Sequence, residues 1–581
     1  MPIPAPMPST QSDTRLAGLI EPMQRDRPNR RIGEVIAELG FAKRDVVEAA
    51  VELARRSGEL TGEVLIKSGV ITAEQLTRAL AERHGLEYID FSVFTPDMGA
   101  ANLIDAQAAK RYSAVPVAFL DDRTLLVAMA DPANILAIDD IAMMTRYEVH
   151  RAVASEEDVA AVIAHIDRVE HHIGIEADVD DAAVPAAVTD LETPTEDAPI
   201  VRLVHSVIAA AIERGASDIH FDATAADMNV RYRIDGVMWD STTIPRRMVP
   251  GAVSRIKIMA DMDIAEKRKP QDGRVSISLD GRMVDVRLVV LPTVEGESVV
   301  MRILEKNDRV VNFQELGMEG EPLKRFEQSI GRSHGAVLVT GPTGSGKSTT
   351  LYSALDAIRS PEKTIITIED PVEVRVAGVK QVQVNHKAGL DFAAGLRSMM
   401  RADPDVIMVG EIRDRETALT AIESSLTGHL ILSTLHTNDA PTAVTRLVEM
   451  GIEPFLVASS ITCVVAQRLA RALCDACKAP VSITAEVLRE NGFDATSDLD
   501  AFGPVGCVRC GSTGYKGRIG MFEVMRMSQA IRELVLARAA AESIAEVADR
   551  EGMRRLHLDG LDKVQAGKTS LSEILRVTAA V

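Results

Sequence analysis

The chain has 581 residues, too many for a single hydrophobic core and typical of about four domains. Hydrophobic residues make up 46% and charged residues 26%, a balance that excludes a disordered or fibrous protein. The net charge of −20 argues against sequence-independent binding of nucleic acid, because such binding needs clustered Lys and Arg to neutralise phosphates.

No segment offers the roughly 18 consecutive apolar residues of a membrane-spanning helix. The longest uncharged stretches, 424–438 and 454–467, are shorter and contain polar groups. The first residues also lack the apolar run of a secretory signal. The sequence therefore predicts a cytoplasmic protein that associates with the inner face of the cytoplasmic membrane only through partners.

An internal repeat follows residues 1–28, whose richness in Pro, Ser and charge predicts a flexible segment. RIGEVIAELGFAKRDVVEAAVELAR (31–55) aligns with LTGEVLIKSGVITAEQLTRALAERH (60–84) at an offset of 29. Each copy has apolar residues at helical spacing around a Gly turn, which predicts two short helices. Two apolar runs within 112–134 surround an Asp-Asp turn and predict a hairpin. The predicted N-terminal domain spans 29–170.

The middle of the chain contains a linker and a mixed domain. Residues 171–197 carry eight Asp or Glu and no Lys or Arg, the composition of an acidic linker. An amphipathic helix ending at Gly215 comes next and leads into strands. The predicted α+β domain spans 198–310. Its strand-like segments include 228–236, 274–291 and 297–304.

A phosphate-binding loop opens the next domain, predicted over 311–470, where strands alternate with helices in the pattern of a doubly wound parallel sheet. GPTGSGKSTT (341–350) lies between an apolar strand and a helix and satisfies G-x-x-x-x-G-K-[ST]. We expect it to bind the phosphates of a nucleotide, with Lys347 reaching the β- and γ-phosphates and Ser348 binding Mg²⁺. The predicted nucleotide-binding residues are Gly341, Pro342, Thr343, Gly344, Ser345, Gly346, Lys347, Ser348 and Thr349.

Polar residues end three further strands of this domain. Glu369 lies at the end of the strand within 364–370, and Glu411 ends 406–411. Because parallel strands present their carboxyl ends at one edge, both carboxylates are candidates to hold Mg²⁺ or to activate water. His436 ends the following strand and could contact a γ-phosphate, while His429 precedes that strand. Solvated loop carboxylates and structural histidines remain the alternatives.

Four of the five cysteines form two C-x₂-C pairs, which suit tetrahedral Zn²⁺ bound by thiolates. Disulfides are disfavoured in a reducing cytoplasm, and free thiols are the other alternative. The sequence predicts a structural zinc subdomain over 471–524 and a helical C-terminal extension over 525–581. The predicted zinc ligands are Cys474, Cys477, Cys507 and Cys510, whereas Cys463 lies in an apolar run and is predicted to be a core residue.

Arginines cluster in the predicted α+β domain. A ring-shaped ATPase needs cations that reach the nucleotide of a neighbouring subunit, although surface ion pairs would use the same residues. Spacing alone does not select among them. The candidates for contact with nucleotide are Arg274, Arg287 and Arg302.

These motifs together resemble the type II secretion and type IV pilus assembly ATPases over nearly the whole chain. Segments that carry the resemblance include GASDIHF (215–221), RKPQDGR (268–274), TIEDPVE (367–373), RADPDVIMVGEIRD (401–414) and GMRRLHLDGLDKVQAGKTS (552–570). The resemblance implies a homo-hexamer in which a PAS-like α+β domain faces the RecA-like P-loop domain of a neighbour. It also implies that ATP hydrolysis drives assembly of pilus or pseudopilus fibres through an inner-membrane platform protein.

The resemblance assigns roles to single residues. Glu369 would activate the attacking water, and Glu411 would act at Mg²⁺ through water, with the reverse assignment open. His436, and with less support His429, would couple nucleotide state to domain rotation. Pilus-retraction ATPases typically lack the long N-terminal region and the four cysteines, so assembly is the better interpretation.

The N-terminal repeat resembles a tandem domain that binds cyclic di-GMP in some of these ATPases. The first copy starts Arg31-Ile32-Gly33, but the second starts Leu60-Thr61-Gly62 and lacks the Arg. Binding of cyclic di-GMP and docking to a membrane-associated partner therefore both stay open. For the whole chain, the alternative is a DNA-uptake or DNA-translocating motor, which the acidic charge balance disfavours.

Overall fold

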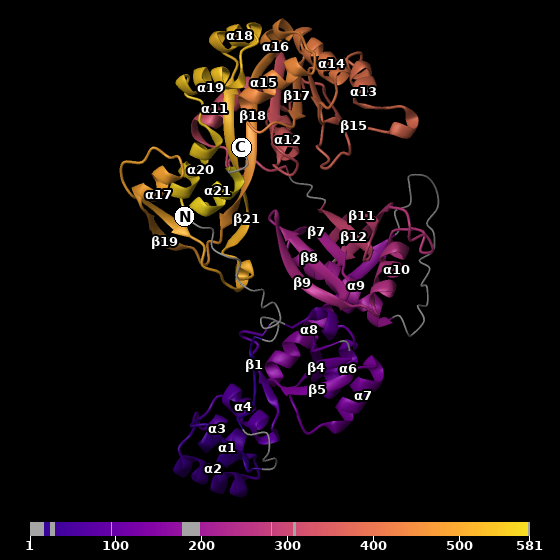
Figure 1. The fold of residues 1–581 in the computed structure, drawn as a ribbon, viewed down its shortest axis with the longest axis vertical. Coiled ribbons are helices and arrows are strands. Elements are labelled where there is room, and N and C mark those ends of the chain that lie inside the picture. Colours follow the sequence, from indigo (N-terminus) through magenta and orange to yellow (C-terminus); the bar gives the residue numbers. More distant parts are fainter. Residues whose placement is uncertain are drawn as a thin grey trace. The chain divides into compact units, whose positions relative to one another are not determined.

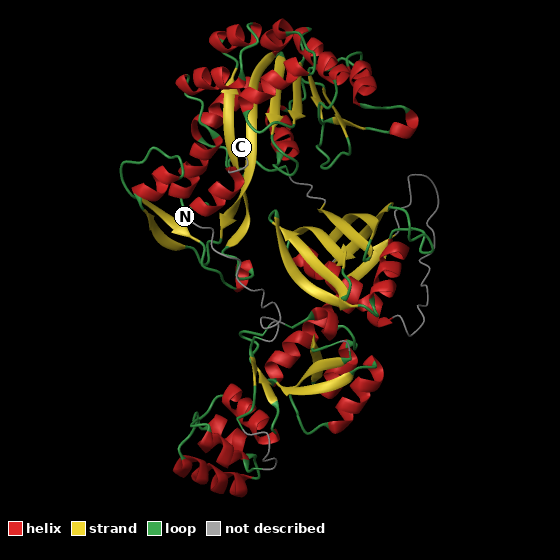
Figure 2. Ribbon diagram, viewed as in Figure 1, coloured by secondary structure: helices red, strands yellow, loops and turns green. Residues whose placement is uncertain are grey.

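The computed structural model describes residues 17–23, 30–94, 96–121, 123–176, 198–279, 282–305 and 310–578. They belong to two compact units, Met1–Glu305 and Lys306–Val581, and many of their elements are labelled in Figure 1. Both units mix helices and strands (Figure 2), which confirms the predicted multidomain α/β class. The finer domain boundaries remain proposals. Within the described ranges no helix is long and apolar enough to cross a membrane.

The N-terminal repeat forms four helices, two from each copy as predicted. A buried glycine at the same place in both copies explains the repeat. A Cβ on Gly33 would lie 2.7 Å from Val47, and one on Gly62 would lie 2.6 Å from Leu76. Each copy therefore needs glycine where its two helices touch. The helices are α1 (Ile32–Glu38), α2 (Arg44–Ser57), α3 (Thr61–Lys67) and α4 (Ala73–His84).

A five-stranded sheet follows the repeat in the first unit. Its order is β1 (Leu19–Ile20), β2 (Glu87–Ile89), β5 (Glu148–Val153), β4 (Thr124–Met129) and β3 (Ala114–Phe119). Strands β3 and β4 pair antiparallel, which confirms the predicted hairpin. Strand β1 lies within the segment predicted to be flexible and pairs with β2; residues 1–16 and 24–29 lie outside the described residues. The helices are α5 (Met98–Ala101), α6 (Ala106–Tyr112), α7 (Ile135–Thr145) and α8 (Glu156–His172).

The second sheet of this unit has seven strands and the helices α9 (Ala198–Glu213) and α10 (Val249–Met259). Alternate residues of its strands, such as Val286, Leu288 and Met301, are buried in the core, so the intervening residues lie on the opposite face. The start of the predicted linker forms β6, and residues 177–197 lie outside the described residues. The strand order is β6 (Ile173–Glu176), β10 (Gln271–Leu279), β11 (Arg282–Thr293), β12 (Gly296–Glu305), β7 (Ala216–Ala223), β8 (Asp227–Ile234) and β9 (Val237–Pro245).

The second unit is built on a seven-stranded sheet. Neighbouring strands are parallel except at β18 and β21, which pair antiparallel. This confirms the predicted doubly wound sheet. Strand β18 was not predicted, because a long apolar run does not distinguish a buried strand from a buried helix. The order is β15 (Lys380–Gln383), β14 (Ile365–Glu369), β16 (Val406–Val409), β17 (Leu430–Leu435), β13 (Gly335–Thr340), β18 (Ile461–Leu473) and β21 (Tyr515–Arg526).

Helices cover this sheet and form the C-terminal part of the unit. They are α11 (Gly320–Ile330), α12 (Lys347–Ile358), α13 (Phe392–Met399), α14 (Arg415–Leu426), α15 (Ala440–Glu449), α16 (Pro454–Ser460), α18 (Gln529–Leu536), α19 (Ala541–Arg550), α20 (Leu556–Gln565) and α21 (Leu571–Thr578). Between β18 and β21 the chain forms the ribbon β19 (Ala479–Ile483) and β20 (Leu499–Gly503), with α17 (Ala485–Glu490). Buried Glu573 of α21 pairs with Arg471 of β18 at 2.8 Å, which fixes the last helix to the sheet.

Candidate ATPase site and cysteine cluster

The phosphate-binding loop joins β13 to α12. Gly341, Gly344 and Gly346 all have positive φ, a backbone conformation that glycine adopts without strain. Lys347 begins α12 and is 8% exposed. Its Nζ donates to the carbonyls of Gly341 at 2.9 Å and Pro342 at 3.0 Å. The loop's own carbonyls therefore hold the amine that is expected to contact phosphates.

Burial of the ammonium lowers the pKa of Lys347, and the Glu411 carboxylate opposes that shift. The opposing effect indicates that Glu411 lies within electrostatic reach of Lys347. Glu411 follows β16, and its side chain is 15% exposed. It pairs with Arg413 at 2.5 Å and with Nε2 of His436 at 3.3 Å. The ends of β16 and β17 thus bring two predicted site residues together.

Glu369 ends β14 and is 3% exposed. Its carboxylate accepts hydrogen bonds from the hydroxyls of Tyr352 and Thr367 and from Nε2 of Gln381. Burial raises the pKa of Tyr352, and the adjacent Glu369 carboxylate raises it further. The hydroxyl therefore stays protonated and donates a hydrogen bond to the carboxylate. The carboxylate is therefore held by three protein donors.

Tyr352 and Gln381 were not identified from the sequence. Tyr352 lies on α12, five residues after Lys347, and is 3% exposed. A polar aromatic residue buried on the helix that follows a phosphate loop is the available signal, since a buried hydroxyl needs a partner. Gln381 lies in β15 beside β14, and only the strand pairing places it.

The two histidines lie at opposite ends of β17. His436 follows its carboxyl end, where Thr437 donates its amide to Oγ1 of Thr340 at 2.8 Å, which ties this segment to the strand before the phosphate loop. His429 precedes β17, its carbonyl accepts from the Gly335 amide at 3.1 Å, and its Nδ1 lies 2.9 Å from the Ser424 carbonyl. His429 therefore lies at the opposite edge of the sheet from His436 and the phosphate loop, and its suggested role in coupling nucleotide state to domain rotation stays a prediction.

The three predicted arginines form one row across the second sheet of the first unit. Arg274 pairs with Arg287 across β10 and β11, and Arg287 pairs with Arg302 across β11 and β12. Arg302 then pairs with Asp218 of β7, to which its Nε donates at 2.9 Å. Like charges opposite one another destabilise a sheet, so this row is suited to an external anion.

The four cysteines lie together, with all sulfur atoms within 4.8 Å of one another. Cys474 and Cys507 are 3.9 Å apart, and Cys510 lies 3.8 Å from both Cys477 and Cys507. A tetrahedron with Zn–S distances of about 2.3 Å has sulfur–sulfur edges of about 3.8 Å. The amide of Gly514 donates to the Cys510 sulfur at 3.2 Å, as suits a thiolate. The predicted cluster is confirmed, and its geometry fits zinc.

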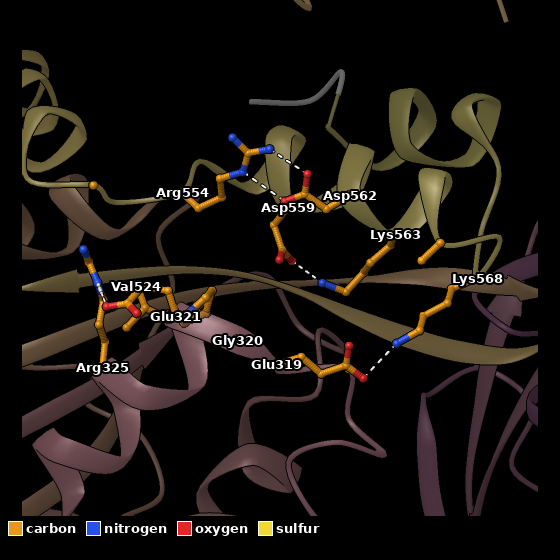
Figure 3. A pocket seen from close by; sticks show the side chains of 14 residues that line it. Glu319, Gly320, Glu321, Arg325, Val524, Arg554, Asp559, Asp562, Lys563 and Lys568 are labelled. Carbon is orange, nitrogen blue, oxygen red and sulfur yellow. Dashed lines mark hydrogen bonds and ion pairs between the residues drawn. The ribbon is translucent and has the colours of Figure 1, made fainter. Parts of the chain in front are cut away.

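A separate hollow of about 480 Å³ lies between α11, β21 and α20 (Figure 3). Its charged side chains pair with one another: Arg554 with Asp562, Lys563 with Asp559, and Lys568 with Glu319. Because these charges are satisfied within the protein, the hollow does not indicate a particular ligand.

The fold and the phosphate-loop site define a P-loop ATP hydrolase. Residues 193–576 match the type II/IV secretion system protein family, and residues 84–173 match the MshEN domain. The chain belongs to the type II/IV secretion system protein family, the family of secretion ATPases.

Two named sequence relatives support this assignment. The chain is 42% identical over 561 residues to the type IV pilus assembly ATPase PilB of Myxococcus xanthus, covering 94% of this chain and 99% of that protein. It is 48% identical over 389 residues to type II secretion system protein E of Aeromonas hydrophila, covering 67% of this chain and 77% of that protein. A crystal structure of the pilus retraction motor PilT with bound ADP has 26% identity and a TM-score of 0.43, covering 64% of this chain and 95% of that chain. The comparisons do not support the DNA-translocating alternative.

Proposed function

We propose that this protein is the ATP-hydrolysing motor of type IV pilus assembly, with assembly of a type II secretion pseudopilus as the second candidate. The observation that most directly supports ATPase activity is the phosphate loop, with Glu369, Glu411 and His436 at the ends of three strands of its sheet. The PilB relative aligns over 94% of this chain, whereas the secretion relative aligns over 67%. Of these two, the pilus relative is the one whose alignment takes in most of the N-terminal region.

In this proposal the loop residues Gly341–Thr349 bind ATP, Lys347 contacts its phosphates, and Ser348 holds Mg²⁺. Mg²⁺, when bound, neutralises charge that develops on the phosphates. Glu411 acts on the metal side, supported by its electrostatic effect on Lys347. Glu369 orients and deprotonates the attacking water, once that water has replaced one of the three hydrogen-bond donors that now hold the carboxylate. His436 links this edge to the loop that follows β17.

The arginine row acts on the nucleotide of a neighbouring subunit in a homo-hexamer. Arg274, Arg287 and Arg302 stand opposite one another with a single carboxylate, Asp218, at the end of the row. Phosphate from a neighbour would relieve their mutual repulsion, since Arg binds phosphate through paired N–H donors. Each nucleotide would then be enclosed by two subunits, which makes hydrolysis sensitive to their relative movement.

Zn²⁺ fills the cysteine cluster as a structural ion. Four thiolate ligands leave no coordination position open for catalysis. The cluster ties the residues after β18 to those before β21, so zinc stabilises the ends of the two strands that complete the sheet.

Outside the ATPase unit, the N-terminal repeat serves as a docking or regulatory domain that places the motor at the membrane through a partner. The motor acts on an inner-membrane platform protein. Cyclic di-GMP is a candidate ligand of the repeat, although only the first copy has the expected Arg31. Calorimetry with cyclic di-GMP on the full chain tests this role. The absence of a heat of binding at micromolar cyclic di-GMP would contradict it.

Two experiments test the main proposal. The purified oligomer should hydrolyse ATP, and Lys347→Ala should abolish that activity; undiminished activity in the variant would place the site elsewhere. Deletion of the gene should remove surface pili while protein secretion and DNA uptake are scored in the same strain. Loss of secretion with intact pili would favour the pseudopilus instead.

A further inference from the structure

Strand β18 carries two buried polar side chains beside the phosphate loop. Thr340 at the end of β13 pairs with Ala466, so Gln467 and Arg468 come next to the point where the loop begins. Gln467 is 1% exposed and Arg468 is 5% exposed. Neither residue belongs to a motif identified from the sequence.

Gln467 packs directly against the loop. A Cβ on Gly341 would lie 2.4 Å from the Gln467 carbonyl oxygen, and a Cβ on Gly346 would lie 2.8 Å from Nε2 of Gln467. Oε1 of Gln467 accepts from the Thr350 hydroxyl at 2.7 Å, whereas Nε2 has no hydrogen-bond partner among the described residues. The β18 backbone therefore leaves no room for a side chain at Gly341, and the Gln467 side chain packs against Gly346.

Arg468 is a buried cation with unused donors. Its Nη2 donates to Oδ1 of Asn438 at 2.8 Å, but Nε and Nη1 have no partner in the described part of the chain. On the same strand, Arg471 has its charge matched by Glu573 at 2.8 Å and lies 4.1 Å from the Tyr515 ring. A buried charge that no carboxylate of the described residues contacts as an ion pair is costly. Burial lowers the pKa of Arg468, and the Asp439 carboxylate opposes that shift without contacting it.

The charge of Arg468 also reaches the phosphate loop. Burial is the main cause that lowers the pKa of Lys347; the Glu411 carboxylate opposes this shift, and the charge of Arg468 adds to it. Two buried cations therefore act on one another at the place where an anion is expected. Asn438, the partner of Arg468, follows His436 by two residues in the segment after β17.

We propose that Arg468 is a nucleotide-binding residue whose free Nε and Nη1 donate to a phosphate of the nucleotide on the loop. Its hydrogen bond to Asn438 then reports phosphate occupancy to the segment that carries His436. The inference rests on the proposed function, because the anion it assigns is the nucleotide. Gln467 packs against Gly341 and Gly346, and in this proposal that contact holds the loop in position beside Arg468.

The test uses the full-length protein with Arg468→Met, which keeps the side-chain volume and removes the charge. We expect affinity for a non-hydrolysable ATP analogue with Mg²⁺, measured by calorimetry, to fall about tenfold or more. Without nucleotide, the melting temperature should stay the same or rise, because an unpaired buried charge is gone. The rise in melting temperature on adding the analogue should shrink. Arg468→Lys keeps the positive charge but lacks the several N–H donors of the guanidinium, so it should lose part of the affinity. It provides the same test if the Met variant does not fold.

Arg471→Met is the matched control on the same strand. It should lower the melting temperature without nucleotide and leave affinity for the analogue unchanged. Unchanged affinity in both Arg468 variants would overturn the inference and make the residue structural. Lys347→Ala in the same assay separates the two proposals. Full affinity for the analogue in Lys347→Ala would contradict the proposed site itself. Lost affinity in Lys347→Ala, together with unchanged affinity in both Arg468 variants, would contradict only this inference.

Discussion

The phosphate-loop edge and the cysteine cluster hold their functional groups in opposite ways. At the edge, Lys347 is bound by two carbonyls of its own loop and Glu369 by three donors. In the cluster, the four sulfur atoms already stand at the spacing of a tetrahedral metal site. The edge must exchange protein partners for a ligand, whereas the cluster needs only the ion.

This difference matches what each region is proposed to do. A motor binds and releases nucleotide in every cycle, so contacts that replace the nucleotide keep Lys347 and Glu369 satisfied between cycles. A structural ion stays bound, and its ligands have no need of alternative partners.

The largest effect is expected from the cluster. Cys510→Ser should release zinc and destabilise the ATPase unit by several kcal/mol, because zinc binding contributes about 10 kcal/mol or more in small zinc domains. Metal content by mass spectrometry and thermal unfolding measure both effects. Cys463→Ala is the control, since this buried thiol lies in the core apart from the cluster and its loss should leave zinc in place. A Cys510→Ser protein with full stability would show that the cluster is not a metal site.

At the edge, Glu369→Gln should lower kcat for ATP hydrolysis about a hundredfold or more, the usual contribution of a general base, while affinity for ATP is kept. Steady-state kinetics with an ATP-binding titration measure this. Glu416→Gln is the control, because its exposed ion pair with Arg397 should contribute little. If Glu411→Gln instead gives the kcat loss and Glu369→Gln shifts the Mg²⁺ requirement, the two assignments must be exchanged.

Strand β18, which leads into the cysteine cluster, is held to α21 by the buried ion pair of Arg471 and Glu573. The stability that this pair contributes depends on pH. Arg576 and Arg471 together hold the pKa of buried Glu573 down at about 2, against the cost of its burial. A depressed pKa stabilises the fold above the unfolded value near 4.5, and that stability is lost as the pH falls toward 2. Glu573→Gln should therefore cost about 3 kcal/mol of unfolding free energy at pH 7 and much less at pH 2.5. Denaturant unfolding at both pH values measures it, and an equal deficit at both would contradict the ion pair.

The smallest effect concerns the restraint on Glu369. Tyr352→Phe removes one donor and should cost about 1 kcal/mol of stability, with a modest rise in kcat because the carboxylate is freed. Tyr515→Phe is the matched control: it loses a hydroxyl bonded to Ser570 at 2.6 Å and should cost similar stability without changing kcat. A lower kcat in Tyr352→Phe would mean that the hydroxyl assists Glu369 rather than restraining it.

Local motifs made the loop, the cluster and the alternating strands predictable from the sequence. The phosphate loop and each C-x₂-C pair are short local patterns, and their chemistry needs those residue types. Arg468 and Gln381 were not predictable, because their roles depend on which strands are neighbours in the sheet. The placement of His429 before β17 was predictable, because the apolar run that forms the strand begins directly after it.

The central claim is that each ATP site uses the phosphate loop of one subunit and the arginine row of the next. Lys347→Ala and Arg287→Ala should each lose ATPase activity when purified alone. Mixed and reassembled, the two variants should regain activity, because some interfaces then combine an intact loop with an intact arginine row. A mixture that remains as inactive as either variant, with mixed oligomers verified by differential tagging, would contradict the shared site.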